Sequence, residues 1–243
     1  QTPINAIEKS YYDTDFLASD AVSYLDTEKL DVNTITRIFS AGMLGRKKNR
    51  KLVPTRWSIT AVDDIISKNN VERIKRFQEI NEIRIFSYKF FGNQFVIMLL
   101  PDVWSYEMVE VWFKGAFMNP SMKDIGLGDW EPYTGRSEYA SNVTGAYYAA
   151  RLAVTEYLLK IQRQAKAIVL REISDEYRFP LGVWVIRVSA RAAMKEKYSL
   201  ADNIDTAFQF LERYMKYPVE YWKHKSKLYY LTKTQTKLDE FFL

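Results

Sequence analysis

The chain has 243 residues, 47% of them apolar and 15% aromatic, and this composition excludes wholesale disorder because it can bury a substantial core. It has no cysteine and one histidine, His224, which excludes disulfides and thiolate metal sites within the chain and argues against a histidine-based zinc site or a serine triad. The net charge of +5 favours polyanionic partners such as nucleic acid.

The start of the chain indicates that it is the later part of a longer protein whose N-terminal region is missing. Gln1 stands where a natural chain begins with Met, and no signal peptide follows it. A cytoplasmic protein is therefore the default expectation. Residues 13–30 are acidic and polar, and the first predicted helix begins near Asn33, where apolar residues recur at helical spacing before Gly42 and Gly45.

The densest charge in the chain follows this helix. Five of six consecutive positions are cationic: Arg46, Lys47, Lys48, Arg50 and Lys51. Arg56 and Trp57 come shortly afterwards. Clustered cations neutralise phosphates and an adjacent aromatic ring can stack on a base, so we predict that these seven residues contact nucleic acid. The alternative is a solvated basic loop that binds no ligand.

A second helix is predicted after Thr55, and it carries two adjacent acids. Thr60 and Asp63 have the spacing of a capping box, and both Asp63 and Asp64 suit the positive end of a helix. Paired carboxylates also serve as metal ligands, but no third acid stands at a compelling spacing. We therefore expect no metal site in this chain. The helical pattern continues as a basic stretch over residues 70–78.

Three strands are expected next, over residues 83–91, 95–100 and 109–113. Gly92-Asn93 is predicted to be the turn between the first two. The second of these, Phe95–Leu100, is the longest unbroken apolar run and is far too short to span a bilayer, so no membrane partner is expected. A long loop from Met118 to Arg136 follows, and its Trp130 and Tyr133 favour an ordered, functional segment.

The longest predicted helix runs from Thr144 to Ile173 and is apolar nearly all round in its first half, as a central buried helix is. Residues 180–186 are predicted to form a buried strand, and residues 202–215 an amphipathic helix. Because helices and strands mix freely along the chain, we predict one α+β domain with a small antiparallel sheet, a long buried central helix and a flexible C-terminal tail.

Charges on a buried helix must be paired or must face a cleft. The candidates for an anion-binding cleft are Tyr133, Arg136, Arg151, Glu156, Arg187 and Arg191. The alternative is that Glu156 forms a structural ion pair with Arg151 or Lys160. No nucleophile elbow, phosphate loop or dinucleotide fingerprint is present, so the sequence assigns no catalytic residue.

The C-terminal segment carries a short binding motif. Leu238, Phe241 and Phe242 stand at i, i+3 and i+4 and form one apolar plug, with Gln235 one turn earlier. This pattern is that of the box (PIP box) by which replication and repair proteins hold the sliding clamp PCNA, in the helix-in-groove manner. The lead-in from Lys225 to Thr234 has the polar, basic character of a tether, so residues 1–224 are assigned to the body and 225–243 to the tether. A C-terminal turn that docks on its own domain is the alternative.

Longer stretches resemble the archaeal Nre family of DNA repair proteins. The resemblance rests on four segments: Leu44–Asp64, Tyr147–Ala153, Gln162–Ala165, and Gly182-Val183-Trp184 with Arg187 and Arg191. It implies a role in DNA-damage tolerance and a C-terminal clamp-binding box, which Gln235, Leu238, Phe241 and Phe242 match position by position. Members often carry a cysteine-rich N-terminal segment, so zinc is an expectation only for a region outside this chain. The resemblance names no reaction.

The leading hypothesis is a DNA repair factor tethered to PCNA, with a basic body that contacts DNA. The alternative is an enzyme that acts on nucleic acid or a nucleotide. One deep cleft that holds Arg46, Arg56, Arg151 and Glu156 together would favour the enzyme, and a scattered arrangement would favour a binding module.

Overall fold

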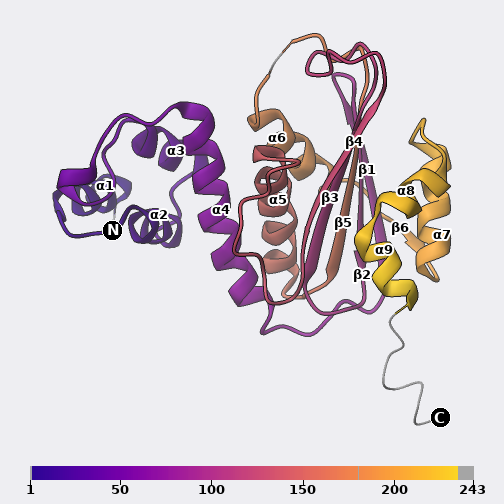
Figure 1. The fold of residues 1–243 in the computed structure, drawn as a ribbon. Coiled ribbons are helices and arrows are strands. Elements are labelled where there is room, and N and C mark those ends of the chain that lie inside the picture. Colours follow the sequence, from indigo (N-terminus) through magenta and orange to yellow (C-terminus); the bar gives the residue numbers. More distant parts are fainter. Residues whose placement is uncertain (1, 180, 235–243) are drawn as a thin grey trace.

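A six-stranded sheet organises the fold, with helices in layers on both faces (Figure 1). The computed structural model describes residues 2–179 and 181–234. The strands are β1 (Ile83–Phe90), β2 (Asn93–Leu100), β3 (Ser105–Trp112), β4 (Ile125–Glu131), β5 (Lys166–Ile173) and β6 (Ser199–Ala201). Their order across the sheet is β4-β3-β5-β2-β1-β6. The β3–β5 pair is parallel and the other neighbouring pairs are antiparallel.

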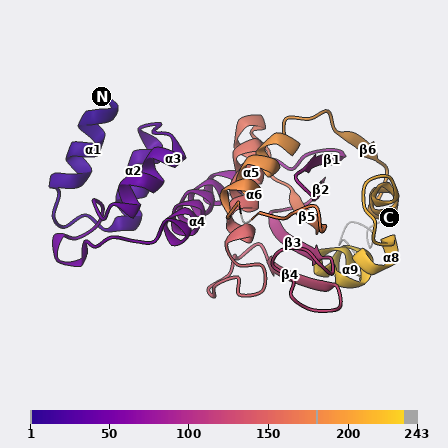
Figure 2. The same ribbon diagram turned by 90° about the horizontal axis from the view of Figure 1, so that it is seen from above.

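The helices lie in successive layers (Figures 1 and 2). One face of the sheet is covered by α5 (Gly145–Ile161) and α6 (Trp184–Ala193). On the outer side of α5 lie α4 (Thr55–Ile74) and, beyond it, α1 (Pro3–Tyr12), α2 (Ala18–Thr27) and α3 (Val32–Ser40). The other face is covered by α7 (Ile204–Gln209), η2 (Phe210–Arg213), α8 (Val219–Lys225) and α9 (Lys227–Thr234).

The helix α4 belongs to two hydrophobic cores. Val62 and Ile66, in its first half, pack with α1–α3 and with Leu152 of α5. Val71 and Ile74, in its second half, pack in the core between α5 and the sheet. The N-terminal helices are thereby joined to the sheet through a shared element.

The helices α4, α5 and α6 begin at the same end of the sheet. β1 and β5 run in the same direction because each pairs antiparallel with β2. α4 and α5 each lead back into one of these strands and α6 follows β5, so all three helices start where β1 and β5 end (Figure 1). At this junction a Cβ on Gly145 would lie 2.8 Å from Oγ1 of Thr60 on α4 and 2.8 Å from Val183 just before α6. Only glycine allows so close an approach.

The predicted α+β class and the long buried helix are confirmed, and the sheet is larger than expected and mixed. The predicted helix over 144–173 ends at Ile161, because Gln162 adopts a left-handed conformation, and residues 166–173 form β5. The predicted loop from Met118 to Arg136 contains the strand β4. The turn between β1 and β2 is Phe91-Gly92, one residue earlier than predicted.

Two predictions about helices are wrong. The predicted strand over 180–186 is not formed in its described part: residues 181–183 lead into α6 and residues 184–186 begin it, and Val185, Ile186, Ser189 and Ala190 of α6 are buried at helical spacing. The capping box is also wrong, because α4 starts at Thr55, so that Thr60 and Asp63 lie in its interior.

The segment before the predicted clamp-binding motif is part of the fold up to Thr234. The carboxylate of Glu107 on β3 accepts hydrogen bonds from Oγ of Ser226 at 2.6 Å and from the backbone N–H groups of Lys227 at 2.6 Å and Leu228 at 3.1 Å. Leu228 is buried. α9 is thus anchored to the sheet, and the predicted motif, Gln235, Leu238, Phe241 and Phe242, lies outside the described residues. None of the helices within 2–179 and 181–234 has the length and apolar character that a membrane crossing requires.

Candidate nucleic-acid interface

The basic loop between α3 and α4 has a defined shape. Gly42 has φ +71°, and a Cβ there would lie 2.5 Å from the carbonyl oxygen of Lys51, so the loop closes against the end of α3 only with glycine. The backbone N–H of Val53 donates to Ser40 at 3.0 Å. A short 3₁₀ turn, η1 (Lys47–Asn49), forms the tip of the loop.

Arg50 differs from the other cations of this loop because its guanidinium turns inward. Nε donates to the carbonyl oxygen of Gly45 at 2.6 Å, and the two terminal nitrogens donate to the carbonyl oxygens of Tyr11 at 2.7 Å and Asp13 at 3.0 Å. The guanidinium also lies over the ring of Tyr11. Arg50 therefore holds the loop against the segment between α1 and α2.

The remaining predicted contact residues are exposed to solvent: Arg46, Lys47, Lys48, Lys51, Arg56 and Trp57. The first three line a concavity of about 600 Å³ together with Thr14 and Asp15. Arg56 and Trp57 stand in the first turn of α4, which lies within the described residues and has neither an acidic side chain nor a side-chain cap. The positive end of this helix therefore adds to the field of the cations.

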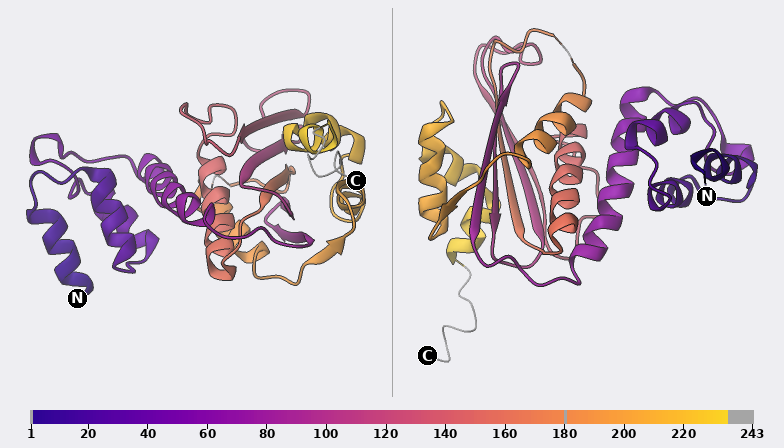
Figure 3. Two further views of the ribbon diagram at one scale, coloured as in Figure 1. Left: turned by 90° about the horizontal axis from the view of Figure 1, so that it is seen from below. Right: turned by 180° about the vertical axis from the view of Figure 1, so that it is seen from behind.

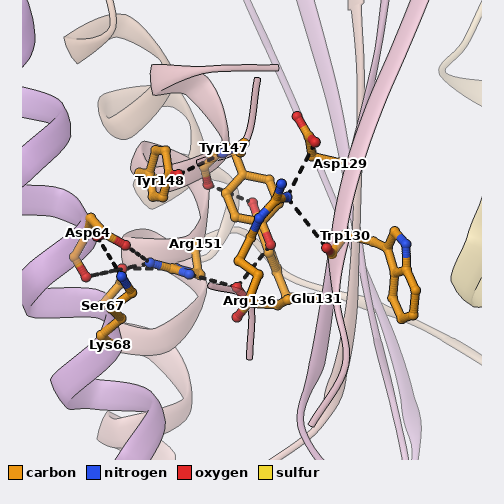
Figure 4. A network of polar contacts seen from close by, with 12 residues as sticks. Asp64, Ser67, Lys68, Asp129, Trp130, Glu131, Arg136, Tyr147, Tyr148 and Arg151 are labelled. Atoms are coloured by element: carbon orange, nitrogen blue, oxygen red, sulfur yellow. Dashed lines mark hydrogen bonds and ion pairs between the residues drawn. The ribbon is translucent and has the colours of Figure 1, made fainter. Parts of the chain in front are cut away.

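Farther along α4, Arg151 of α5 is buried between this helix and the sheet (Figure 4). One terminal nitrogen lies 2.7 Å from Glu131 Oε2 on β4, and the other pairs with Asp64 on α4. Nε donates to Oγ of Ser67 at 3.0 Å. Burial disfavours the guanidinium charge, but the two carboxylates outweigh this cost and raise the pKa of Arg151.

Glu131 is the other centre of this network. Its carboxylate also accepts hydrogen bonds from the Tyr147 hydroxyl at 3.0 Å and from the Trp104 indole at 3.2 Å. Burial, followed by the neighbouring Glu131 charge, raises the pKa of Tyr147, so this hydroxyl stays a donor. The ion pair is thus completed by neutral hydrogen-bond donors, as a buried charge requires.

The loop after β4 is attached to the same network. Arg136 lies over the ring of Tyr147 and contacts Asp129 at 3.3 Å (Figure 4). Asp129 also accepts hydrogen bonds from the backbone N–H groups of Asn142 and Val143. Tyr133 lies against Nζ of Lys75 on α4. A cavity of about 280 Å³ opens beside these residues, with Lys68, Lys75, Glu131, Arg136 and Arg151 among its lining side chains.

The other predicted cleft residues form two further ion pairs, which join α6 to α4 and to α5. Arg187 of α6 lies 2.7 Å from Asp63 of α4, and both side chains are buried. Arg191 pairs with Glu156 of α5 through two hydrogen bonds at 2.7 Å and 2.6 Å, so Glu156 takes neither of its predicted partners, Arg151 and Lys160. Burial raises the pKa of Asp63 to about 7, against the opposing effect of Arg187.

The structure thus places the predicted site residues in separate surroundings. Arg46 borders the concavity of the basic loop, Arg136 and Arg151 border the small cavity beside Glu131, and Glu156 and Arg191 border a third one of about 640 Å³ beside Tyr157 and Tyr198. Within residues 2–179 and 181–234, no group of three or more histidine, aspartate and glutamate side chains is placed to hold a metal ion.

Sequence reasoning missed Glu131, Asp129 and Glu107, the carboxylates on which these contacts depend. All three lie on strands, and all are buried. A charged residue within an apolar strand pattern is a usable signal, because such a residue needs a partner. The partner itself cannot be read from the sequence.

Comparison with known proteins adds the family. The family models described as "Archaeal Nre, N-terminal" and "Archaeal Nre, C-terminal" match residues 2–119 and 131–241. The chain belongs to the archaeal Nre family. Its curated relatives include the DNA repair proteins NreB and NreA of Archaeoglobus fulgidus, with 44% identity over 93% of this chain and 39% over 97% of it.

A third relative of the Nre chain is the DNA repair protein NreA of Haloferax volcanii, with 37% identity over 91% of this chain. The matches cover 57%, 58% and 53% of the three relatives, so the chain spans little more than half of their length. No solved structure matches it.

Proposed function

We propose that this Nre chain is the DNA-contacting part of a DNA repair factor that is tethered to the sliding clamp PCNA. The observation that carries the proposal is the basic loop, where Arg50 holds the backbone while four neighbouring cations, Arg46, Lys47, Lys48 and Lys51, remain free of ion pairs within the described residues. A preformed surface of this kind loses little conformational entropy when it meets phosphates. The three curated relatives carry the name DNA repair protein.

Two further observations support binding rather than catalysis. The cations of the basic loop and the charges of α5 border different cavities. Arg151, Arg187 and Arg191 are each paired with a carboxylate, so their charges are already compensated inside the protein. An enzyme that used these arginines on a substrate would first have to break those pairs.

The placement of α9 supports the tether. α9 lies on the opposite face of the sheet from α1–α4 and the basic loop (Figure 3). The predicted clamp-binding residues, Gln235, Leu238, Phe241 and Phe242, follow α9 in sequence. The clamp and DNA would thus be engaged from different sides of the molecule, and tethering would raise the local concentration of the basic loop on clamp-loaded DNA.

DNA contact is tested by the salt dependence of binding. Lys47→Gln with Lys48→Gln should reduce the slope of log affinity against log salt by about 2, since each phosphate contact contributes about 0.9. The matched control is Lys195→Gln with Lys197→Gln, two exposed lysines near β6, which should leave the slope unchanged. An unchanged slope in the Lys47 and Lys48 variant would contradict the proposed interface.

Clamp binding is tested separately by calorimetry with an archaeal PCNA. Phe241→Ala with Phe242→Ala should abolish binding without lowering the melting temperature. Thr236→Ala with Asp239→Ala changes positions that the motif leaves free and should bind normally. If the double phenylalanine variant binds as tightly as the wild type, the tether proposal is wrong.

A further inference from the structure

Two tryptophans are exposed at one end of the helical layer. Trp57 in the first turn of α4 is 62% exposed, and Trp184 at the first position of α6 is 44% exposed. Tryptophan is highly buried on average because its large ring gains much from leaving water. Two exposed indoles therefore need a reason other than packing.

The two tryptophans flank the same point. Thr60 and Val183 both lie against Gly145, the first residue of α5. Trp57 stands three residues before Thr60, on the same side of α4, and Trp184 directly follows Val183. The backbone segments that carry the two tryptophans therefore lie on either side of the start of α5.

The backbone at this point is held in an unfavourable conformation. Thr144, directly before α5, has φ +61° and ψ −134°, a region that a β-branched residue rarely adopts. The surrounding contacts thus impose a defined geometry between α4 and α6. Such geometry fixes the backbone positions from which the two indoles project.

The charge around the tryptophans suits a polyanion. The first turns of α4, α5 and α6, all within the described residues, carry no acidic side chain. The nearest acids farther along α4, Asp63 and Asp64, are paired with Arg187 and Arg151. Arg56 adjoins Trp57 and is exposed, as are the lysines of the basic loop.

We propose that Trp57 and Trp184 form a stacking surface for the unpaired bases of single-stranded DNA, with its phosphates against Arg56 and the exposed lysines. This inference rests on the proposed DNA contact and names the form of DNA that is preferred. Indole rings stack on any base whose face is free, and the bases of a duplex have no free face along the helix. The tryptophans therefore discriminate between single strands and duplex, while the lysines attract both.

The test measures binding of the full chain to a labelled oligothymidine and to a blunt duplex of equal length. Trp57→Ala and Trp184→Ala should each weaken single-strand binding about 5- to 140-fold, the range for loss of one stacked base, and leave duplex binding within about twofold. Trp57→Phe and Trp184→Phe should retain most of the affinity because phenylalanine also stacks. Unchanged melting temperatures establish that the variants fold.

The matched control is Tyr230→Ala, which removes an aromatic side chain that is 57% exposed on α9, across the sheet. It should bind both forms of DNA as the wild type does. Wild-type affinity of both tryptophan variants for oligothymidine, or an equal loss on single strand and duplex, would overturn the stacking surface. If duplex binding still depends on Lys47 and Lys48, the proposed DNA contact survives that result; if the wild type binds neither form, both proposals fail.

Discussion

Arg151 on α5 and Glu131 on β4 form an ion pair at 2.7 Å in which only 1% and 2% of the side-chain surfaces reach solvent. The pair connects the helical layer to the edge region of the sheet, and Asp64 extends it to α4. A buried charge that loses its partner keeps its desolvation cost without compensation. The stability of the chain should therefore depend strongly on the pair.

Arg151→Met should lower the free energy of unfolding by about 3–5 kcal/mol, the cost of leaving a buried carboxylate unpaired. Urea denaturation measures this change. Lys68→Ala removes the exposed partner of Asp64 and should cost at most about 1 kcal/mol. The combined variant Arg151→Met with Glu131→Gln should lose less than the sum of the single changes, and strict additivity would contradict the coupling.

The stability of the chain should vary with pH through Asp63. Burial raises the pKa of Asp63 from 3.8 to about 7. Between about pH 4 and pH 7, Asp63 is therefore protonated in the folded protein and ionised in the unfolded chain. The stability that Asp63 contributes is therefore full below about pH 4 and is lost as pH rises through about 7. In Asp63→Asn, the decline of unfolding free energy across this window should be smaller than in the wild type.

Comparing the pH dependence of unfolding free energy in the wild type and in Asp63→Asn isolates the contribution of Asp63. Other buried acids, such as Glu107, whose pKa is also raised, titrate in both proteins. Asp175→Asn, at an exposed position, serves as the control and should keep the wild-type slope. Denaturation at a series of pH values measures the slope of unfolding free energy against pH for each protein. Identical slopes in the wild type and Asp63→Asn would count against the raised pKa.

Substitutions in the basic loop should affect stability and DNA binding separately: Arg50 should matter for stability, and Lys47 and Lys48 for DNA binding. Arg50→Ala removes three hydrogen bonds from a charged group and should cost about 1.5–3 kcal/mol of unfolding free energy. Lys47→Gln with Lys48→Gln should change stability by less than about 0.5 kcal/mol while weakening DNA binding. Thermal unfolding and DNA titration on the same samples check both. Loss of stability in the lysine variant would show that those side chains also hold the loop.

Glu107 should control the attachment of α9. Glu107→Ala leaves the hydroxyl of Ser226 and the N–H groups of Lys227 and Leu228 without their acceptor and should cost about 1–3 kcal/mol. Amide hydrogen exchange over residues 227–234 should accelerate more than exchange in β5. Glu212→Ala, an exposed acid near α8, should leave exchange unchanged. Equal acceleration across the sheet would indicate global unfolding instead.

The sequence was sufficient to predict the features that depend on local pattern. The β1–β2 hairpin follows from two apolar runs around a glycine, and α5 from its apolar stretch. The predicted helix over 144–173 includes residues 166–173, whose Ala, Leu, Arg and Glu are good helix formers. The pairing of this segment with both β2 and β3 overrides that preference, and this contact is visible only in three dimensions.

The candidate site shows the same limit. The exposed cations and Trp57 could be predicted because a run of charge is visible in the sequence. The inward turn of Arg50 could not, since its acceptors are carbonyl oxygens up to 39 positions earlier in the chain. Trp184 belongs to a segment that resembles the family. Its exposure could not be predicted, because the sequence indicates a buried strand where the structure has the start of α6.

The sheet order has a consequence for the two family regions. Residues 2–119 supply β1, β2 and β3, and residues 131–241 supply β5, β6 and the last residue of β4, Glu131. In space β5 inserts between β3 and β2, so the strands of the two regions are interleaved. A gene divided between them would produce two polypeptides with unpaired strand edges, each obliged to complete its sheet with the other. We therefore expect the two halves of this chain to fold as one cooperative unit.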